Sequence, residues 1–118
     1  MAESPLWCFL FVEEDVIVGA TGFIGGVLRT RSLPEGWIFN LACPGSPVRQ
    51  RANPERVVEA NTSVMMGILD YAKTEGKRVF HASTVEVHGN AQTPYCQGKQ
   101  IAEKMCGIYV REFGVDVR

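Results

Sequence analysis

Hydrophobic residues lie in short runs that alternate with longer segments in which apolar positions recur every three or four residues. The short runs are rich in branched and aromatic side chains and are residues 16–18, 37–42 and 78–84. The longer segments have helical spacing and are residues 23–32, 54–75 and 94–113. Runs of the first kind favour buried strands, and segments of the second kind favour helices with one packed face. This alternation predicts an α/β fold, in which a parallel sheet is flanked by helices.

Proline, glycine and capping residues mark the ends of these segments. The pairs 53–54 and 93–94 join a capping side chain to a proline, which is typical of helix starts. Gly76 and Gly114 end the two helices that follow, and residues 115–118 begin a further strand. The length of 118 residues, without a linker or an internal repeat, predicts a single domain over residues 1–118.

The first strand runs into a glycine-rich turn, residues 19–25, that opens a helix. Gly19 allows a sharp bend, Gly22 removes the side chain where phosphate oxygens approach the backbone, and Gly25 lets the helix lie close to the sheet. The free N–H groups at the start of that helix face an anion. The unit predicts a site for a dinucleotide pyrophosphate. The alternative is an ordinary tight turn with no ligand.

Tyr95 and Lys99 stand one helical turn apart at the start of the last helix, so that both side chains project from one face. A free tyrosine, with a pKa of about 10, is a poor base near neutral pH, and an adjacent ammonium favours the phenolate. With the positive nicotinamide of NAD+ nearby, Tyr95 could then exchange a proton with a sugar hydroxyl. A surface pair on an amphipathic helix is the alternative interpretation.

The composition limits the partners that the chain is expected to have. It has 12 basic and 13 acidic residues, a formal net charge of −1, which offers no broad positive field for nucleic acid or a membrane. Cysteines 8, 43, 96 and 106 show no paired spacing, and no metal site is expected from them. Reduced thiols are typical of a cytoplasmic protein. The apolar run 6–12 is too short to span a bilayer and is not expected to be a signal peptide.

Three blocks of the sequence together resemble the extended branch of the short-chain dehydrogenase/reductases, the NAD-dependent epimerase/dehydratase family. They are the strand and glycine turn 16–25, the segment 40–62 that begins Asn-Leu-Ala-Cys-Pro, and the segment 82–103 that contains Ser83-Thr84, Tyr95 and Lys99. Within this family the sequence is most similar to the UDP-glucuronate decarboxylases. The resemblance implies a Rossmann-like domain that binds NAD and a nucleotide-sugar substrate like UDP-glucuronate.

The resemblance also implies roles for single residues. Tyr95 is then the general base, Lys99 tunes it and binds the nicotinamide ribose, and Thr84 holds the sugar hydroxyl. Glu86 corresponds to an extra carboxylate of the decarboxylases and dehydratases, and a solvated loop acid is the alternative for it. The implied catalytic residues are Thr84, Glu86, Tyr95 and Lys99. The implied cofactor-binding residues are Gly19, Gly22, Phe23, Ile24, Gly25, Leu41, Ala42, Asn61, Tyr95 and Lys99.

By the same resemblance, the reaction is a decarboxylation. In such enzymes NAD+ removes a hydride from the sugar C4, the resulting ketone eases loss of the C6 carboxylate, and the hydride returns. Dehydratases usually have an aspartate between the positions of Thr84 and Glu86, where this chain has Val85. Valine cannot donate a proton to a leaving water, so dehydration is disfavoured.

The interval 26–36 departs from the family, which has two further strands there. It has room for one helix, because each parallel crossover needs about a dozen residues. The second and third strands are therefore expected to be missing, together with the acid about 20 residues after the glycines that holds the adenosine ribose. The sequence also stops before the family's C-terminal substrate lobe. The preference between NAD and NADP stays open.

The shortened interval leaves two possible arrangements of the sheet. Either the first helix lies on the other face, or the strand 37–42 takes the place of the missing strands, since right-handed crossovers are nearly obligatory. We also expect residues 6–12 to form a strand that covers the edge left open.

Two functional hypotheses remain from the sequence. The first is an NAD-dependent nucleotide-sugar enzyme, in which a second chain could complete the active site. The second is a noncatalytic remnant that binds dinucleotide weakly or not at all. In both, the helices Pro54–Glu75 and Tyr95–Phe113 are expected to pair with a second copy in a homodimer.

Overall fold

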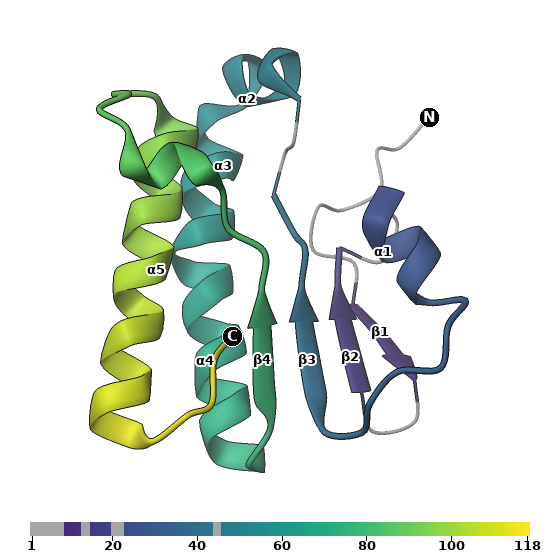
Figure 1. Ribbon diagram of the computed structural model, residues 1–118. Helices are drawn as coiled ribbons and strands as arrows, with labels where there is room; N and C mark the ends of the chain where they lie inside the picture. Colours follow the sequence, from purple (N-terminus) through teal and green to yellow (C-terminus); the bar gives the residue numbers. More distant parts are fainter. Residues whose placement is uncertain (1–8, 13–14, 20–22, 44–45) are drawn as a thin grey trace.

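The centre of the protein is a sheet of 4 strands in the order β1-β2-β3-β4 (Figure 1). The computed structural model describes residues 9–12, 15–19, 23–43 and 46–118. The strands are β1 (Phe9–Val12), β2 (Asp15–Val18), β3 (Trp37–Asn40) and β4 (Arg78–His81). β2, β3 and β4 are parallel, with Ile38 opposite Val16 on one side and Val79 on the other. The α/β fold with a parallel sheet, expected from the sequence, is confirmed, although β3 and β4 end earlier than expected.

β1 covers one edge of the parallel sheet by antiparallel pairing with β2, in which Leu10 lies opposite Ile17. The strand expected along the open edge is therefore confirmed for residues 9–12, and the rest of that expectation, residues 6–8, lies outside the described residues. An edge strand that is paired in this way no longer offers its backbone to other chains on that side.

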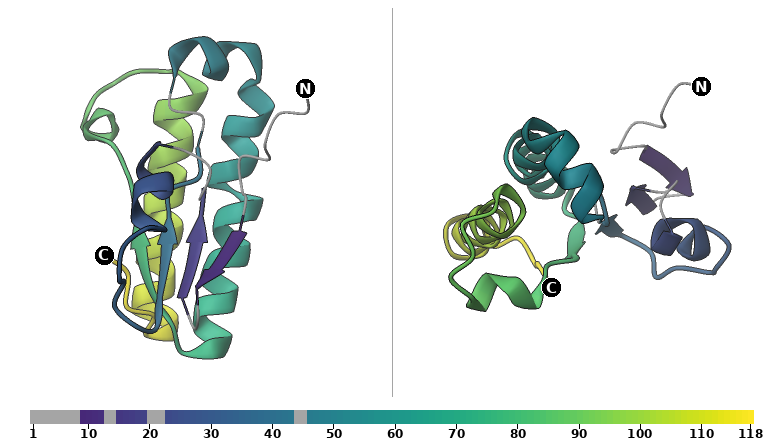
Figure 2. Two further views of the ribbon diagram at one scale, coloured as in Figure 1. Left: turned by 90° about the vertical axis from the view of Figure 1, so that its right-hand side faces the viewer. Right: turned by 90° about the horizontal axis from the view of Figure 1, so that it is seen from above.

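The helices form layers on both faces of the sheet (Figure 2). They are α1 (Phe23–Leu28), α2 (Pro47–Ala52), α3 (Pro54–Asn61), α4 (Ser63–Glu75), the 3₁₀ helix η1 (Val85–His88) and α5 (Pro94–Phe113). α3, α4 and α5 lie on one face, and α1 lies on the opposite face. In the part of the chain that the structure describes, no helix is both long and apolar enough to span a bilayer.

The placement of α1 and α4 on opposite faces gives the two crossovers of the parallel strands opposite hands. β2, β3 and β4 step across the sheet in one direction (Figure 1). The unit β3-α4-β4 has the common right hand, so the unit β2-α1-β3 is left-handed, which is rare. A right-handed unit β2-α1-β3 would require α1 to move to the face that α4 covers, and α1 has not moved there. The vacated edge of β2 is occupied by β1 and not by β3. Neither arrangement expected for the shortened interval is therefore found.

Two helices differ in extent from the expected segments. α1 ends at Leu28, several residues before the expected end at Ser32, because Thr30 Oγ1 donates a hydrogen bond of 2.7 Å to the Val27 carbonyl and the chain turns. The segment 54–75 is not one helix but two, divided at Thr62. The Thr62 hydroxyl donates to the Val58 carbonyl at 2.7 Å, and a bond of this kind bends or interrupts helices.

α2 was not expected from the sequence. Ser46 Oγ accepts a hydrogen bond of 3.2 Å from Arg49 N, and Pro47 occupies the first turn, so that the chain begins a helix where its prolines had indicated only the end of a strand. α5 has the expected start, since Thr93 Oγ1 accepts from Cys96 N at 3.1 Å, and it ends as expected at Gly114.

The core lies between the sheet and α4 and continues under α5. Val16, Ile38 and Val79 of three neighbouring strands share one buried cluster with Met65 and Leu69 of α4. The end of the sequence joins this core, because Val115 is buried in the same cluster and Val117 forms a parallel bridge with Val79. This packing fixes α5 against the sheet and so sets the position of the residues in its first turns.

Candidate functional site

The expected catalytic residues gather where β4 ends and α5 begins. Thr84 follows β4 and is the N-cap of η1, with its hydroxyl accepting from Glu86 N at 3.3 Å. Tyr95 and Lys99 lie on the first two turns of α5. Because the carboxyl ends of parallel strands form one edge, these residues share that edge with residues 41–43 after β3.

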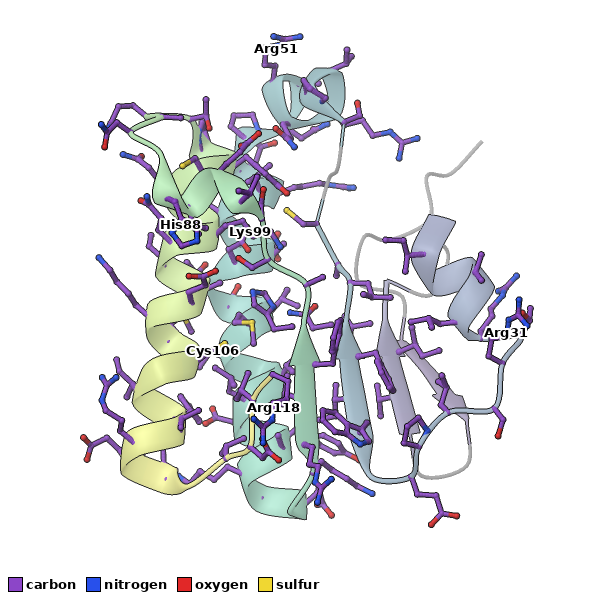
Figure 3. All side chains as sticks on the ribbon, in the orientation of Figure 1. Arg31, Arg51, His88, Lys99, Cys106 and Arg118 are labelled. Atoms are coloured by element: carbon purple, nitrogen blue, oxygen red, sulfur yellow. The ribbon has the colours of Figure 1, made fainter. Side chains whose placement is uncertain are left out.

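Lys99 is the most buried charged residue of the site, with 5% of its surface exposed. Its Nζ donates a hydrogen bond of 2.9 Å to the carbonyl oxygen of Ala82, and Figure 3 shows it between α5 and the segment after β4. Burial lowers the pKa of the amine, and negative charge on Cys43, Cys106 and Glu103 opposes that decrease. The structure thus holds an amine at a fixed point beside the strand end.

The pKa of the Tyr95 hydroxyl is raised, mainly by burial. A hydrogen bond with Thr84 lowers this pKa, whereas the charged forms of Cys43 and Glu86 raise it further. The decrease expected from the adjacent ammonium is wrong for the protein alone, because Lys99 Nζ lies 6.0 Å from the centre of the Tyr95 ring and is bound to Ala82. A further positive charge would have to enter the site to make Tyr95 a base near neutral pH.

Asn61, the last residue of α3, lies against α5. It is 1% exposed, and its Nδ2 donates to the Val57 carbonyl at 2.8 Å and to Cys43 Sγ at 3.6 Å. Gly98, next to Lys99, packs directly on it, since a Cβ at Gly98 would lie 3.0 Å from Asn61 Nδ2. A small residue at position 98 therefore lets α3 and α5 approach closely enough to place Asn61 beside the Tyr95 and Lys99 turns.

Glu86 is exposed in η1 and acts on Tyr95 through its charge. This position is compatible with a carboxylate that meets a substrate and with a solvated loop acid. Among the residues that the structure describes, no group of three or more His, Cys, Asp and Glu side chains is placed to hold a metal ion.

The expected dinucleotide turn is described in part. Gly19 has φ of +88°, and a Cβ there would lie 2.9 Å from the Leu41 backbone, so glycine is required where the ends of β2 and β3 meet. Ala42 is buried beside this contact. Phe23 begins α1 and Gly25 is buried in it, whereas Ile24 is 59% exposed. Gly22 lies outside the described residues.

The residues present fit the nicotinamide half of a dinucleotide better than the adenosine half. On the nicotinamide side, Lys99 offers a fixed amine, and the bare backbone at Gly19 lies against Leu41. On the adenosine side, Glu35 is the sole acid between the glycine turn and α3 in the sequence, and it precedes β3, at the opposite end of the sheet. Asn61 and Ala42 complete the set of residues that could hold the nicotinamide half.

Three polar residues near the site were not singled out from the sequence. Asn40 is 3% exposed, and its Nδ2 lies 3.1 Å from His81 Nδ1 across β3 and β4. Burial is the main cause that lowers the pKa of His81 to about 4, and no partner among the described residues bonds its buried Nε2. Cys43 contacts Asn61 and affects both Tyr95 and Lys99. The signal in the sequence for Asn40 and His81 was a polar side chain inside an apolar strand segment, at a position that alternation directs toward the core.

Sequence comparisons relate the chain to one protein family. A family model described as "NAD dependent epimerase/dehydratase family" matches residues 36–118. UDP-glucuronic acid decarboxylase 1 of Danio rerio is 33% identical over 99 residues, which cover 69% of this chain and 24% of that protein. UDP-glucuronic acid decarboxylase 5 of Arabidopsis thaliana is 29% identical over 99 residues, which cover 69% of this chain and 29% of that protein. The chain thus spans about a quarter of the length of these curated relatives.

Solved structures have the same fold over part of their length. A monomeric L-threonine 3-dehydrogenase from a metagenome has a TM-score of 0.65 and 26% identity, over 71% of this chain and 32% of that chain. UDP-glucose 4-epimerase from Brucella ovis in complex with NAD has a TM-score of 0.63 and 18% identity, over 70% and 30%. RMD from Pseudomonas aeruginosa complexed with NADPH has a TM-score of 0.69 and 17% identity, over 86% and 51%.

Proposed function

Because the chain belongs to the NAD dependent epimerase/dehydratase family, we propose that it binds NAD at the carboxyl ends of its parallel strands and acts there on a nucleotide sugar. The favoured reaction is decarboxylation of a sugar like UDP-glucuronate, which the similarity to UDP-glucuronic acid decarboxylases supports. The observation that carries the proposal is the buried amine of Lys99, fixed on the Ala82 carbonyl one helical turn from Tyr95. A buried ammonium whose hydrogen bond goes to a neutral carbonyl is costly and is typical of a functional site.

The residues of the site would have separate roles in binding and proton transfer. Thr84, beside the Tyr95 hydroxyl, would hold the sugar hydroxyl that reacts, and Tyr95 would take the proton from that hydroxyl. Lys99 would bind the nicotinamide ribose, with Asn61 and the backbone at Gly19, Leu41 and Ala42 shaping the same half of the site. NAD+ supplies the hydride acceptor and, in its oxidised form, a positive charge that favours ionisation of a nearby phenol.

The loss of carbon dioxide would follow from the oxidation of the sugar. A ketone at C4 accepts the electron pair that is left when the bond from C5 to the carboxylate carbon breaks, and a proton then replaces the carboxylate. Val85 offers no proton for the expulsion of water, so the site favours this course over dehydration. Glu86 is the carboxylate placed nearest to Thr84 in sequence for a further role in proton transfer.

A second candidate function is a noncatalytic subunit that pairs with a second copy of the chain. Large apolar side chains are exposed on α3, α4 and α5, on the sides of these helices that the sheet does not cover. They include Val58, Met66, Tyr71, Ile101 and Ile108. Packing of these helices on their copies would form a helical bundle and bury this surface. The same contact would also suit an active homodimer.

The proposed activity is tested by incubating the purified chain with NAD+ and UDP-glucuronate that is radiolabelled at the carboxylate carbon. We expect release of labelled carbon dioxide by the wild type, and a loss of at least about 100-fold in Tyr95→Phe, as for removal of a general base. Tyr71→Phe is the matched control, because Tyr71 is exposed on α4 and the substitution keeps the apolar ring that a contact with a second copy would use. Release that is equal in Tyr95→Phe and the control would refute the proposed role of Tyr95, and no release by the wild type would favour the noncatalytic subunit.

A further inference from the structure

A side-chain hydrogen bond joins the strand and the helix that form the site. Ser83 Oγ donates to Glu103 Oε1 at 2.6 Å, a length typical of a bond to a charged oxygen. Ser83 immediately precedes Thr84 after β4, and Glu103 lies one helical turn beyond Lys99 on α5. The two partners therefore sit next to two residues of the proposed active site without belonging to it.

The groups around Lys99 differ in whether they carry charge near neutral pH. Burial raises the pKa of Cys43, and it is the main cause that raises the pKa of Cys106 to about 11, so both thiols are neutral there. His81 on β4, with a pKa of about 4, is neutral as well, and burial keeps the Tyr95 phenol protonated. Glu103, by contrast, is an acidic residue exposed on α5. Among the groups that act on the Lys99 amine, it is thus the standing negative charge.

We propose that Glu103 is a positioning residue of the site. The hydrogen bond that it accepts from Ser83 holds the neighbouring Thr84 at the strand end, and its negative charge keeps the Lys99 amine in its ammonium form. This inference rests on the proposed function for its purpose, since Thr84 and Lys99 matter there for the sugar hydroxyl and the cofactor ribose. The Ser83–Glu103 hydrogen bond and the charge of Glu103 are properties of the protein without any ligand. They are also separable, because glutamine can accept the Ser83 bond but has no charge.

Three variants separate the two effects. Glu103→Gln removes the charge and keeps an acceptor for Ser83, and Ser83→Ala removes the hydrogen bond and keeps the charge. Glu112→Gln is the matched control, because it makes the same chemical change at an exposed position near the other end of α5. Ser83 and Glu103 are exposed as well, so all three variants are expected to fold.

The charge is measured by the rate at which acetic anhydride labels Lys99 in the free protein at pH 8, read by mass spectrometry against the exposed Lys73 as the internal standard. Acetylation requires the neutral amine. We expect labelling of Lys99 to be about two- to four-fold faster in Glu103→Gln, the size of an exposed ion-pair effect, and unchanged in Ser83→Ala and Glu112→Gln. A rate in Glu103→Gln equal to that of the control would overturn the electrostatic part.

The effect of the Ser83–Glu103 hydrogen bond on the position of Thr84 is measured by hydrogen exchange of the Glu86 and Val87 amides, both of which bond to Thr84. We expect exchange about three-fold faster in Ser83→Ala, as for the loss of one hydrogen bond, and near the wild-type rate in Glu103→Gln. Wild-type exchange in Ser83→Ala would overturn the positional part. Both measurements use the protein without cofactor, so a failure of NAD+ binding would remove the proposed function and leave the role of Glu103 to be decided by these two results.

Discussion

Lys99 Nζ donates a hydrogen bond to the main-chain carbonyl of Ala82, and no carboxylate among the described residues accepts one from it, although the residue is almost completely buried. A buried ammonium bound to a neutral oxygen loses hydration that one hydrogen bond does not replace. The residue is therefore expected to cost the protein stability and to be retained for the site.

A first prediction follows for Lys99→Met, which keeps an unbranched side chain and removes the charge. Loss of the bond to Ala82 costs about 1.5–3 kcal/mol because its donor is charged, and relief from the burial of that charge offsets most of this cost. We expect the free energy of unfolding in urea to stay within about 1 kcal/mol of the wild type. A decrease of more than about 3 kcal/mol would show that the amine is mainly structural.

A second prediction concerns His81 and acid pH. Burial is the main cause that lowers the pKa of this imidazole from 6.5 to about 4 in the folded protein. As the pH falls through this window, the unfolded chain binds a proton that the folded protein does not, so stability decreases by up to about 3 kcal/mol. Urea unfolding at pH 7 and pH 4.5 measures the decrease. His81→Gln is expected to have a shallower pH dependence, and His88→Gln, the same change at an exposed position, is the control.

A third prediction tests the close approach of α3 and α5. A Cβ in Gly98→Ala would lie 3.0 Å from Asn61 Nδ2 and 3.4 Å from Asn61 Cβ, so Asn61 must move. We expect a loss of about 1–3 kcal/mol in unfolding free energy, as for overpacking in a core. Gly67→Ala on α4 is the control, because a Cβ there meets no atom within 4 Å, and it is expected to stabilise the helix by about 0.5–1 kcal/mol. Equal effects of the two substitutions would contradict the packing described for Asn61.

The sequence predicted the elements whose signals are local. The apolar runs located β2, β3 and β4, and Thr93 with Pro94 located the start of α5. The spacing of Tyr95 and Lys99 placed them on one helix face, and the strand end placed Thr84 beside them. Each of these inferences depends on residues within one or two turns of each other, where periodicity and capping are informative.

The features that the sequence did not predict depend on contacts between distant segments. The left-handed unit β2-α1-β3 results from where β1 and α4 settle on the sheet, which no local pattern specifies. The break at Thr62 depends on a hydroxyl that can bond to its own helix or leave it intact. The raised pKa of Tyr95 depends on burial and on the direction in which Lys99 points, and the spacing of the two residues contains neither.

The central claim, that the buried amine beside Tyr95 serves a bound NAD, is tested most directly by calorimetric titration of NAD+ into the wild type, Lys99→Met and the surface control Lys104→Met. The account predicts binding by the wild type and by Lys104→Met, with affinity lower by at least about tenfold in Lys99→Met, as for the loss of a hydrogen bond from a charged donor. Absence of binding heat in the wild type, or equal affinity of Lys99→Met and Lys104→Met, would contradict it.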